Sequence, residues 1–357
     1  MSGHRAIELL KKLIAAPSFS RDEAATADIL EAELQSRGIA TRRYKNNVWA
    51  VADNFDSSKP VLLLNSHHDT VRPAAGWTRD PFHPEVENGR LYGLGSNDAG
   101  ASGVSLIEAF DHYRKSSDLS LNLILAITAE EEVSGENGMR SFLPMLKEEG
   151  YKVDMALVGE PTCMQPAIAE RGLVVLDCEA KGVAGHAARG DGKNAIYEAI
   201  ADVEVLKNLT FPKESEELGP IHIAVTQIEA GTQHNVIPAS CKFVVDVRTT
   251  DAYTNEQTVE MIREAISSEA NPRSTRIRAS ALSRRHPMTL AAEALGGVPF
   301  SSPTTSDMAL MNDFPSLKMG PGNSSRSHKA DEYIELEEIN AGVDGYIKFI
   351  QQLAKHY

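Results

Sequence analysis

The first half of the chain contains three runs that are rich in apolar residues, at 61–64, 119–128 and 155–158. Short runs of this kind are typical of strands buried on both faces, as in a parallel sheet. Histidine or acidic residues follow each run: His67, His68 and Asp69 after the first, Glu130, Glu131 and Glu132 after the second, and Glu160 after the third.

The repetition of polar residues after these runs predicts one shared site. In open α/β sheets, ligands bind just outside the carboxyl ends of the strands. His67 and Asp69 have the spacing of an imidazole that binds a metal and a carboxylate that orients it. The adjacent carboxylates at 130–132 repel each other unless a positive charge lies among them. A polar strand end and a solvated turn are the alternatives for each segment alone, but the repetition favours a metal site.

A glycine-rich segment at 93–100 follows the first run. It lacks the third glycine of a dinucleotide-binding fingerprint, because Asp98 occupies that position, and no strong strand precedes it. We therefore interpret it as a tight loop that delivers Asp98 to the site and opens a helix over 101–113. The alternative role for Asp98 is the N-cap of that helix.

After Gly172, apolar and polar residues alternate along several segments. Alternation predicts antiparallel strands with one covered face. The order of elements is β-α-β-β-α-β, which is the ferredoxin-like pattern. The strands are expected at 174–181, 221–228, 241–249 and 274–282, and the helices at 194–209 and 255–268.

After His286 the first pattern returns, with a helix expected at 288–295, a strand at 316–319 and a final helix at 337–354. The sequence therefore predicts a discontinuous α/β catalytic domain with an inserted second domain. The catalytic domain is expected to comprise residues 1–171 and 287–357, and the inserted domain residues 172–286.

Composition narrows the class of protein. A chain of 357 residues fits two domains, and 42% hydrophobic residues is ordinary for a globular protein. The net charge of −14 argues against nucleic-acid and anionic-membrane partners. Three cysteines without a Cys-x-x-Cys motif fit a reducing compartment. We find no signal-peptide core and no apolar run near the ~18 residues of a membrane span, so we expect a cytoplasmic protein.

The chain contains five motifs, given at the end of this paragraph, that occur in the same order in a known enzyme family. Through them it resembles the dinuclear-zinc amidohydrolases that include acetylornithine deacetylase, succinyl-diaminopimelate desuccinylase and the carboxypeptidase G type peptidases. The Gly-Pro-Gly loop at 320–322 and the last motif look most like acetylornithine deacetylase. The resemblance covers nearly the whole chain. It implies a zinc-exopeptidase-like mixed sheet with helices on both faces, plus a ferredoxin-like α+β dimerisation (lid) domain. The motifs are His67-x-Asp69-Thr70-Val71, Tyr92-Gly-x-Gly-Ser96-x-Asp98, Glu130-Glu131-Glu132-Val133, Gly159-Glu160-Pro161-Thr162 and His328-x-x-Asp331-Glu332-Tyr333.

The resemblance also implies a role for seven residues of these motifs. Two zinc ions per subunit are implied, and the ligands would accept cobalt or manganese as well. A cis peptide bond is implied between Asp98 and Ala99. His67 and Glu160 would hold one ion, Glu132 and His328 the other, and Asp98 would bridge them, while Asp69 would orient His67 and Glu131 would be the general base.

Further residues match positions that contact substrate in the family. His186 would donate to the substrate carbonyl from the partner subunit, unless it is a surface loop histidine. Arg171, Asn235, Arg248 and Thr305 would contact the substrate. A strand-surface salt bridge is the alternative for Arg248, and a turn role is the alternative for Thr305.

The sequence departs from the family pattern in two places. The usual Asp-x-Lys-Gly is Asp98-Ala99-Gly100-Ala101 here, and Ser66 replaces the glycine that precedes the first metal histidine. Neither change removes a ligand. His68 should not be a ligand, because successive side chains of a strand point apart.

The function predicted from these residues is hydrolysis of an N-acylated α-amino acid. An N-acetyl or N-succinyl derivative of ornithine or citrulline is favoured, with a place in arginine biosynthesis. A di- or tripeptidase of the same family is the first alternative, and a non-catalytic metal-binding interaction protein is the second. The resemblance also implies a homodimer that forms through the inserted domain.

Overall fold

The computed structural model describes residues 2–357 and divides into two compact units. The first unit comprises residues 2–168, 282–300 and 306–357. The second unit comprises residues 169–281 and the short segment 301–305. That segment returns to the second unit because β16 (Phe300–Ser302) pairs with β8 (Ala167–Glu170), the strand along which the chain passes from the first unit to the second.

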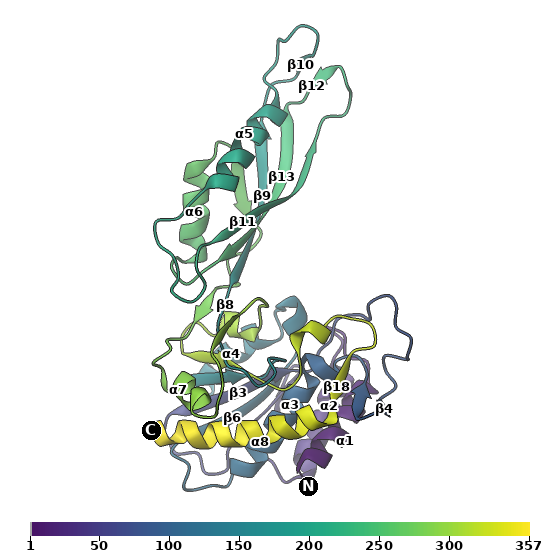
Figure 1. The fold of residues 1–357 in the computed structure, drawn as a ribbon, viewed down its shortest axis with the longest axis vertical. Coiled ribbons are helices and arrows are strands. Elements are labelled where there is room, and N and C mark those ends of the chain that lie inside the picture. The colour runs from purple at the N-terminus through teal and green to yellow at the C-terminus, as the bar shows by residue number, and fades with distance from the viewer. Residues whose placement is uncertain (1) are drawn as a thin grey trace. The chain divides into compact units, whose positions relative to one another are not determined.

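The first unit is built on a mixed sheet (Figure 1). Strands β6 (Asn122–Thr128), β3 (Val61–His67) and β7 (Met155–Val158) are parallel neighbours, and every residue in them is buried. The three apolar runs are therefore central strands, as predicted. The order of its strands is β1-β2-β6-β3-β7-β17-β8, with β1 (Thr41–Tyr44), β2 (Asn47–Val51) and β17 (Ser316–Lys318). The short strand β15 (Ser280–Ala281), which pairs with β8, belongs to the second unit.

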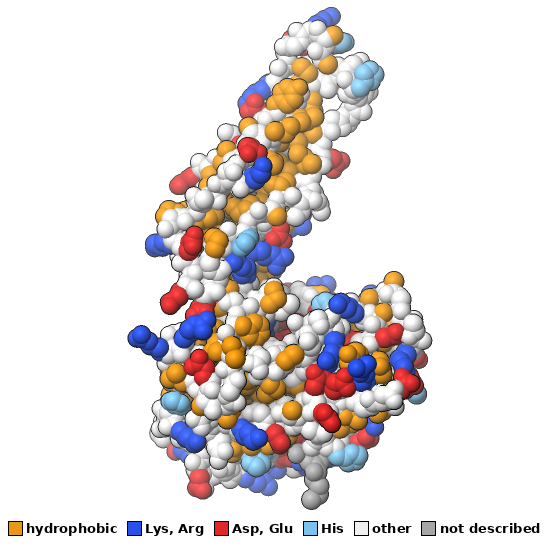
Figure 2. All heavy atoms as spheres, viewed as in Figure 1, with side chains coloured by type: hydrophobic (Ala, Val, Ile, Leu, Met, Phe, Trp, Pro, Cys, Tyr) orange, Lys and Arg blue, Asp and Glu red, His pale blue; other side chains and the backbone are white. Residues whose placement is uncertain are grey.

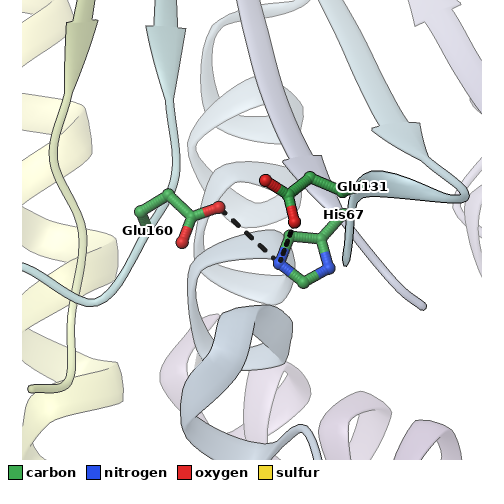
Figure 3. Close-up of side chains that lie close together, drawn as sticks. All are labelled: His67, Glu131 and Glu160. Atoms are coloured by element: carbon green, nitrogen blue, oxygen red, sulfur yellow. Dashed lines mark ion pairs between the residues drawn. The ribbon is translucent and has the colours of Figure 1, made fainter. Parts of the chain in front are cut away.

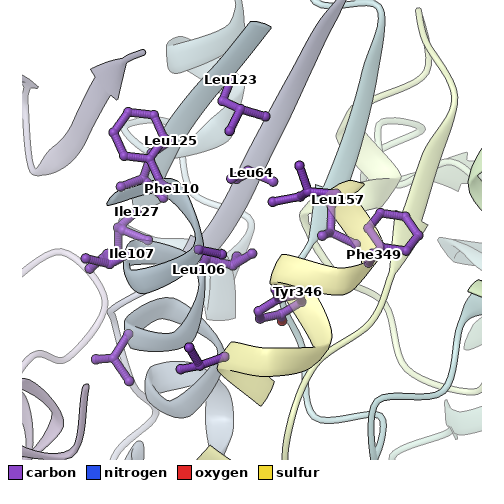
Figure 4. Packing of buried hydrophobic residues seen from close by; sticks show 14 of the residues in the cluster. Leu64, Leu106, Ile107, Phe110, Leu123, Leu125, Ile127, Leu157, Tyr346 and Phe349 are labelled. Carbon is purple, nitrogen blue, oxygen red and sulfur yellow. The ribbon is translucent and has the colours of Figure 1, made fainter. Parts of the chain in front are cut away.

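Alternate residues of β3 enter different apolar clusters on the two faces of the sheet. Leu62 and Leu64 pack with residues of α1, α3 and α8. Figure 4 shows Leu64 in the same cluster as Leu106 of α3 and Tyr346 of α8. Val61 and Leu63 pack with residues of α4. Helices thus cover both faces, which confirms the predicted fold class. The helices of this unit are α1 (Ser2–Ile14), α2 (Ala24–Ser36), α3 (Ala101–Tyr113), α4 (Met139–Glu148), α7 (Pro287–Glu293) and α8 (Leu336–Leu353).

A small three-stranded sheet completes the first unit. It has the order β18-β5-β4 and is antiparallel throughout. Its strands are β4 (Glu85–Glu87), β5 (Arg90–Tyr92) and β18 (Tyr333–Glu335). Because β5 leads into the glycine-rich loop and β18 follows His328, this sheet joins two segments that carry predicted ligands.

The second unit has the predicted β-α-β-β-α-β order, and its sheet order is β11-β13-β9-β14, antiparallel throughout. Alternate residues of β9 (Val174, Leu176, Cys178 and Ala180) form a core with α5 and α6. The elements are β9 (Gly172–Lys181), α5 (Ala195–Asn208), β11 (His222–Ala230), β13 (Ser240–Thr249), α6 (Asn255–Ala265) and β14 (Glu269–Pro272), with a short pair of β10 (Gly185–His186) and β12 (Val236–Ile237).

The prediction of a fourth strand at 274–282 is wrong. The strand that completes the second unit's sheet is β14, and residues 280–281 form β15, which pairs with β8. β14 was missed because it contains Asn271 and Pro272, and both residue types are uncommon in strands. The proline is tolerated because β14 lies at the sheet edge and pairs only with β9, so no neighbour needs the missing N–H group.

None of the helices within residues 2–357 is long and apolar enough to cross a membrane.

Leu64→Ala should destabilise the first unit by about 2–5 kcal/mol, because it leaves a cavity beside the central strand. Both tryptophans, Trp49 and Trp77, belong to this unit, so tryptophan fluorescence during urea unfolding reports on it alone. Leu295→Ala, at a side chain that is 45% exposed, is the control and should change stability by less than about 0.5 kcal/mol. Equal losses in the two variants would contradict the assigned core.

Candidate metal centre

His67 ends β3 with one ring nitrogen bonded and the other free. Its Nδ1 donates to the backbone oxygen of Asp69 at 3.0 Å. Its Nε2 is buried and has no hydrogen-bond partner. Three carboxylates surround this nitrogen: Asp98 Oδ1 at 3.4 Å, Glu160 Oε1 at 3.6 Å and Glu131 Oε2 at 3.9 Å. Figure 3 shows Glu160 and Glu131 directed at it from different segments. A buried nitrogen among carboxylates is a position for a cation.

A second histidine lies on the other side of Asp98. His328 Nε2 is 3.0 Å from Glu132 Oε2 and 3.6 Å from Asp98 Oδ2. The two oxygens of Asp98 therefore face different histidines, His67 through Oδ1 and His328 through Oδ2. All five predicted metal ligands come together in one cluster with Glu131.

The donor atoms fit two metal ions. His67, Glu131 and Glu160 form one group whose ligand atoms lie within 4.8 Å of one another, and His67, Asp98 and Glu132 form another. Nitrogen and carboxylate oxygen are donors that zinc accepts, and an ion in each group would be adjacent to the other.

The electrostatics of the cluster also favour cations. Burial raises the pKa of Glu131 well above its usual range and that of Glu160 to about 8. Their carboxylate neighbours raise the pKa of each further. The hydrogen bond with Glu132 raises the pKa of His328 to about 9. Without metal, these side chains hold protons because the clustered carboxylates need positive charge nearby. Metal ions would supply that charge in place of the protons.

Asp69 holds both sides of the cluster. Its Oδ1 accepts the backbone N–H of Glu131 at 3.0 Å, and its Oδ2 accepts that of Glu132 at 3.2 Å. The hydroxyl of Ser20 donates to Oδ2 at 2.7 Å. Burial would raise the pKa of Asp69, but hydrogen bonds from His67 and Ser20 outweigh it and keep that pKa below its usual range. Asp69 therefore fixes the turn of the two glutamates as well as His67.

The glycine-rich loop presents Asp98 as a site residue. Asp98 is not the N-cap of α3, because that helix has no side-chain cap. The peptide bond between Asp98 and Ala99 is cis, as the resemblance implied. Two site segments also have non-glycine residues with left-handed backbone, Glu130 at φ 56° and His328 at φ 59°. Such conformations persist only where surrounding contacts hold them.

Glu332 is a site residue that sequence reasoning missed. Its buried carboxylate accepts the backbone N–H groups of Gly95 at 3.2 Å, Asn97 at 2.8 Å and Asp98 at 3.0 Å. It thereby ties the loop of Asp98 to the segment of His328. The signal in the sequence was its place in the motif His328-x-x-Asp331-Glu332-Tyr333, where no role was assigned to Glu332.

Asp307 was missed as well. It is buried, and its Oδ2 accepts the hydroxyl of Thr128 at 2.9 Å. Burial raises its pKa to about 6. Thr305 was the predicted site residue in this segment, but Asp307, two positions later, is the one that belongs to the first unit.

His68 stays outside the cluster, as predicted. Its Nε2 donates to the backbone oxygen of Asn46 at 2.9 Å, and its Nδ1 lies 2.8 Å from the hydroxyl of Thr26. Burial lowers its pKa to about 4, so the ring is neutral. It connects β3 to α2 and takes no part in the metal centre.

The remaining predicted site residues belong to the second unit. His186 is exposed in β10 and pairs with Val236 of β12. Its Nδ1 accepts the backbone N–H of Ala188 at 3.2 Å. Asn235 is exposed in the facing loop, and its backbone oxygen accepts the N–H of Ala187 at 3.0 Å. These two residues therefore lie on neighbouring strand ends.

The two predicted substrate arginines already have partners. Arg248 forms a two-pronged ion pair with Asp246, at 2.8 and 3.2 Å. Arg171 donates to the backbone oxygens of Pro220, at 2.7 Å, and Leu218. The hydroxyl of Thr305 lies 3.5 Å from the backbone oxygen of Arg171. The strand-surface pairing considered for Arg248 is what this structure contains.

Known proteins resemble this chain along most of its length. The model of peptidase family M20/M25/M40 matches residues 63–352. A succinyl-diaminopimelate desuccinylase of Dinoroseobacter shibae is 31% identical over 72% of this chain and 71% of its own. Another from Wolbachia pipientis subsp. Culex pipiens is 26% identical over 97% of this chain and 92% of its own.

Solved structures share the fold. The aminopeptidase PepT of Bacillus cereus has a TM-score of 0.77 at 18% identity, over 99% of each chain. The YXEP protein of Bacillus subtilis, described as a dinuclear metal binding peptidase, has a TM-score of 0.76 at 17% identity, over 98% of this chain and 97% of its own. At these identities the likeness concerns the fold.

Metal-free protein should bind two zinc ions per chain, one beside His67 and Glu160 and the other beside His328 and Glu132. His328→Gln should leave one tightly bound ion, because it removes a donor from the second position only. Asp98→Asn should weaken both ions, because its two oxygens face both histidines. Isothermal titration calorimetry with elemental analysis measures both effects. The control is His112→Gln, at an exposed position of α3, which should still bind two ions. Two tight ions in all three variants would refute the site.

Proposed function

Because the chain belongs to peptidase family M20/M25/M40, we propose that it hydrolyses the amide bond of an N-acyl-α-amino acid at the cluster around Asp98. The family and its desuccinylase relatives make the chain a metal-dependent amidohydrolase that acts on a small-molecule amide. The acyl group, the amine product and the roles of single residues are the parts we propose.

The position of Asp98 between two histidines carries the proposal. Its Oδ1 lies 3.4 Å from His67 Nε2 and its Oδ2 lies 3.6 Å from His328 Nε2. We infer that His67 and Glu160 hold one zinc ion, Glu132 and His328 hold the other, and Asp98 contacts both. Cobalt and manganese suit the same donors. When bound, the ions polarise the amide carbonyl and lower the pKa of a water molecule.

Glu131 is the residue we assign to proton transfer. It lies next to the proposed ligands, 3.9 Å from His67 Nε2, and the assignment above would give each ion an imidazole and a carboxylate in addition to Asp98 without using Glu131. Burial raises the pKa of Glu131 well above its usual range, which makes the carboxylate a stronger base. The backbone N–H of Glu131 donates a hydrogen bond to Asp69 Oδ1 at 3.0 Å, which fixes the position of Glu131. Glu131 would take a proton from the attacking water and give it to the leaving amine.

The proposed substrate carries a free α-carboxylate beside an acylated amine. The desuccinylase relatives support an N-succinyl group, and the sequence resemblance favours an N-acetyl or N-succinyl derivative of ornithine or citrulline, in arginine biosynthesis. A cytoplasmic location is part of the proposal, and it is supported by three cysteines that are free within residues 2–357. The complete set of six acidic and histidine side chains counts against a non-catalytic protein.

The second unit has a surface that supports a homodimer. On α5, Tyr197 is 69% exposed and Ile200 54% exposed, and Ile228 of β11 is 55% exposed. Figure 2 shows hydrophobic side chains gathered along this unit. β11 is an edge strand that pairs only with β13 among the described residues. An exposed edge next to apolar side chains is a surface that a second copy can cover.

Glu131→Gln should lower turnover about 10²–10⁴-fold while two metal ions stay bound, because it removes the proton carrier and no assigned ligand. The assay is amine release from N-acetyl and N-succinyl forms of ornithine, citrulline, lysine and diaminopimelate, with dipeptides beside them. Glu136→Gln, at an exposed neighbour, is the control. Turnover of dipeptides only would move the protein to the peptidases, and no turnover of any amide by the two-metal protein would reject the proposal.

If His186 acts from the partner subunit, mixing two inactive variants should restore activity. In a mixed dimer of His186→Ala and Glu131→Ala chains, one site has an intact Glu131 and receives an intact His186 from the other chain. Partial recovery after mixing, with a dimeric mass by light scattering, is the expected result. A dimeric mixture that is as inactive as both parents would show that His186 does not act in this way.

A further inference from the structure

Ser66 lies directly before His67 and contacts the two other segments that carry ligands of the same ion. Its side chain is buried, with 1% of the residue exposed. Its hydroxyl donates to the backbone oxygen of Gly159 at 2.9 Å and lies 3.3 Å from that of Ala99. Gly159 precedes Glu160 in the chain, and Ala99 follows Asp98. One hydroxyl therefore lies between the backbones of three ligand segments.

The space around this hydroxyl is enclosed. A Cβ at Gly159 would lie 2.8 Å from Leu106 Cδ1 and 3.0 Å from Ser102 Cβ, both on α3. A Cβ at Gly103 would lie 3.8 Å from the Ser66 hydroxyl oxygen. The end of β7 and the start of α3 thus approach β3 closely at this point. A side chain at position 66 that cannot donate would leave a buried carbonyl oxygen without this partner, which is unfavourable in such a place.

The ligands of the other ion are fixed by different groups. Asp69 holds the backbone of Glu132, and Glu332 ties the segment of His328 to the loop of Asp98. The Ser66 hydroxyl has no hydrogen bond to the segments that carry Glu132 and His328 among the described residues. Its effect should therefore fall on the ion of His67 and Glu160.

We propose that Ser66 is a positioning residue that sets the approach of Glu160 to His67 and thereby strengthens binding of the metal ion they share. The inference rests on the ligand assignment of the proposed function. The enzymes that this chain resembles usually have glycine at this position, so the tie is a property of this chain. Groups that hold metal ligands in place commonly change metal affinity when they are lost.

The test is zinc binding by the full-length, metal-free protein, measured by competition with a chelator. Ser66→Ala should weaken one of the two ions about 10-fold, the lower end of what such supporting contacts contribute, and leave the other unchanged. Ser105→Ala is the matched control, since this buried serine donates to Ala101 of its own helix at 2.7 Å. It should leave both affinities unchanged. Ser66→Gly, which also lacks the hydroxyl, should reproduce the loss and serves if the alanine variant does not fold.

The affected ion is identified in two backgrounds. In His328→Gln, which retains the ligands of the first ion, adding Ser66→Ala should still weaken binding about 10-fold. In Glu160→Gln, where the positioned ligand is gone, adding it should have no further effect. An equal loss for both ions, or wild-type affinity in the alanine and glycine variants, would overturn the inference and leave the proposed function standing. Wild-type protein that binds no metal would overturn both.

Discussion

The structure depends on bringing partly buried carboxylates together around two imidazoles. Asp98, Glu131, Glu132 and Glu160 would repel one another at such short range, and burial already raises the pKa of Glu131 and Glu160. Such an arrangement is stable only when positive charge is shared among them. Metal ions would supply that charge, and the unpartnered nitrogen of His67 points to where one would bind. The metal ions that would carry out the chemistry would therefore also neutralise the repulsion between the carboxylates.

The fold supports this arrangement with a rigid base and with hydrogen bonds to the backbone. The parallel strands β6, β3 and β7 are buried along their whole length, so their carboxyl ends are fixed relative to one another. Beyond the strands, Asp69 and Glu332 accept backbone N–H groups of the segments that carry Glu131, Glu132 and Asp98. These two acids would therefore position the proposed ligands through the backbone of their segments.

The second unit contains the proposed substrate-contacting residues and none of the proposed metal ligands. Its two candidate arginines are engaged, Arg248 by Asp246 and Arg171 by backbone oxygens. A substrate carboxylate would have to share or displace the partner of Arg248, so that pair sets a threshold for binding. His186, by contrast, keeps an exposed ring, which is what a residue that acts on another chain requires.

The sequence by itself determined the central strands and the alternating second unit, because apolar runs and alternation are local properties of the chain, and its motifs indicated the five proposed ligands through their resemblance to a family. It did not determine β14, because an edge strand containing Pro272 carries no local strand signal. The roles of Glu332 and Asp307 also stayed hidden. Their partners lie 237 residues away at Gly95 and 179 away at Thr128, so only tertiary packing brings them together. The sequence therefore indicated which residues are the proposed ligands, and only the tertiary structure showed which residues hold them in place.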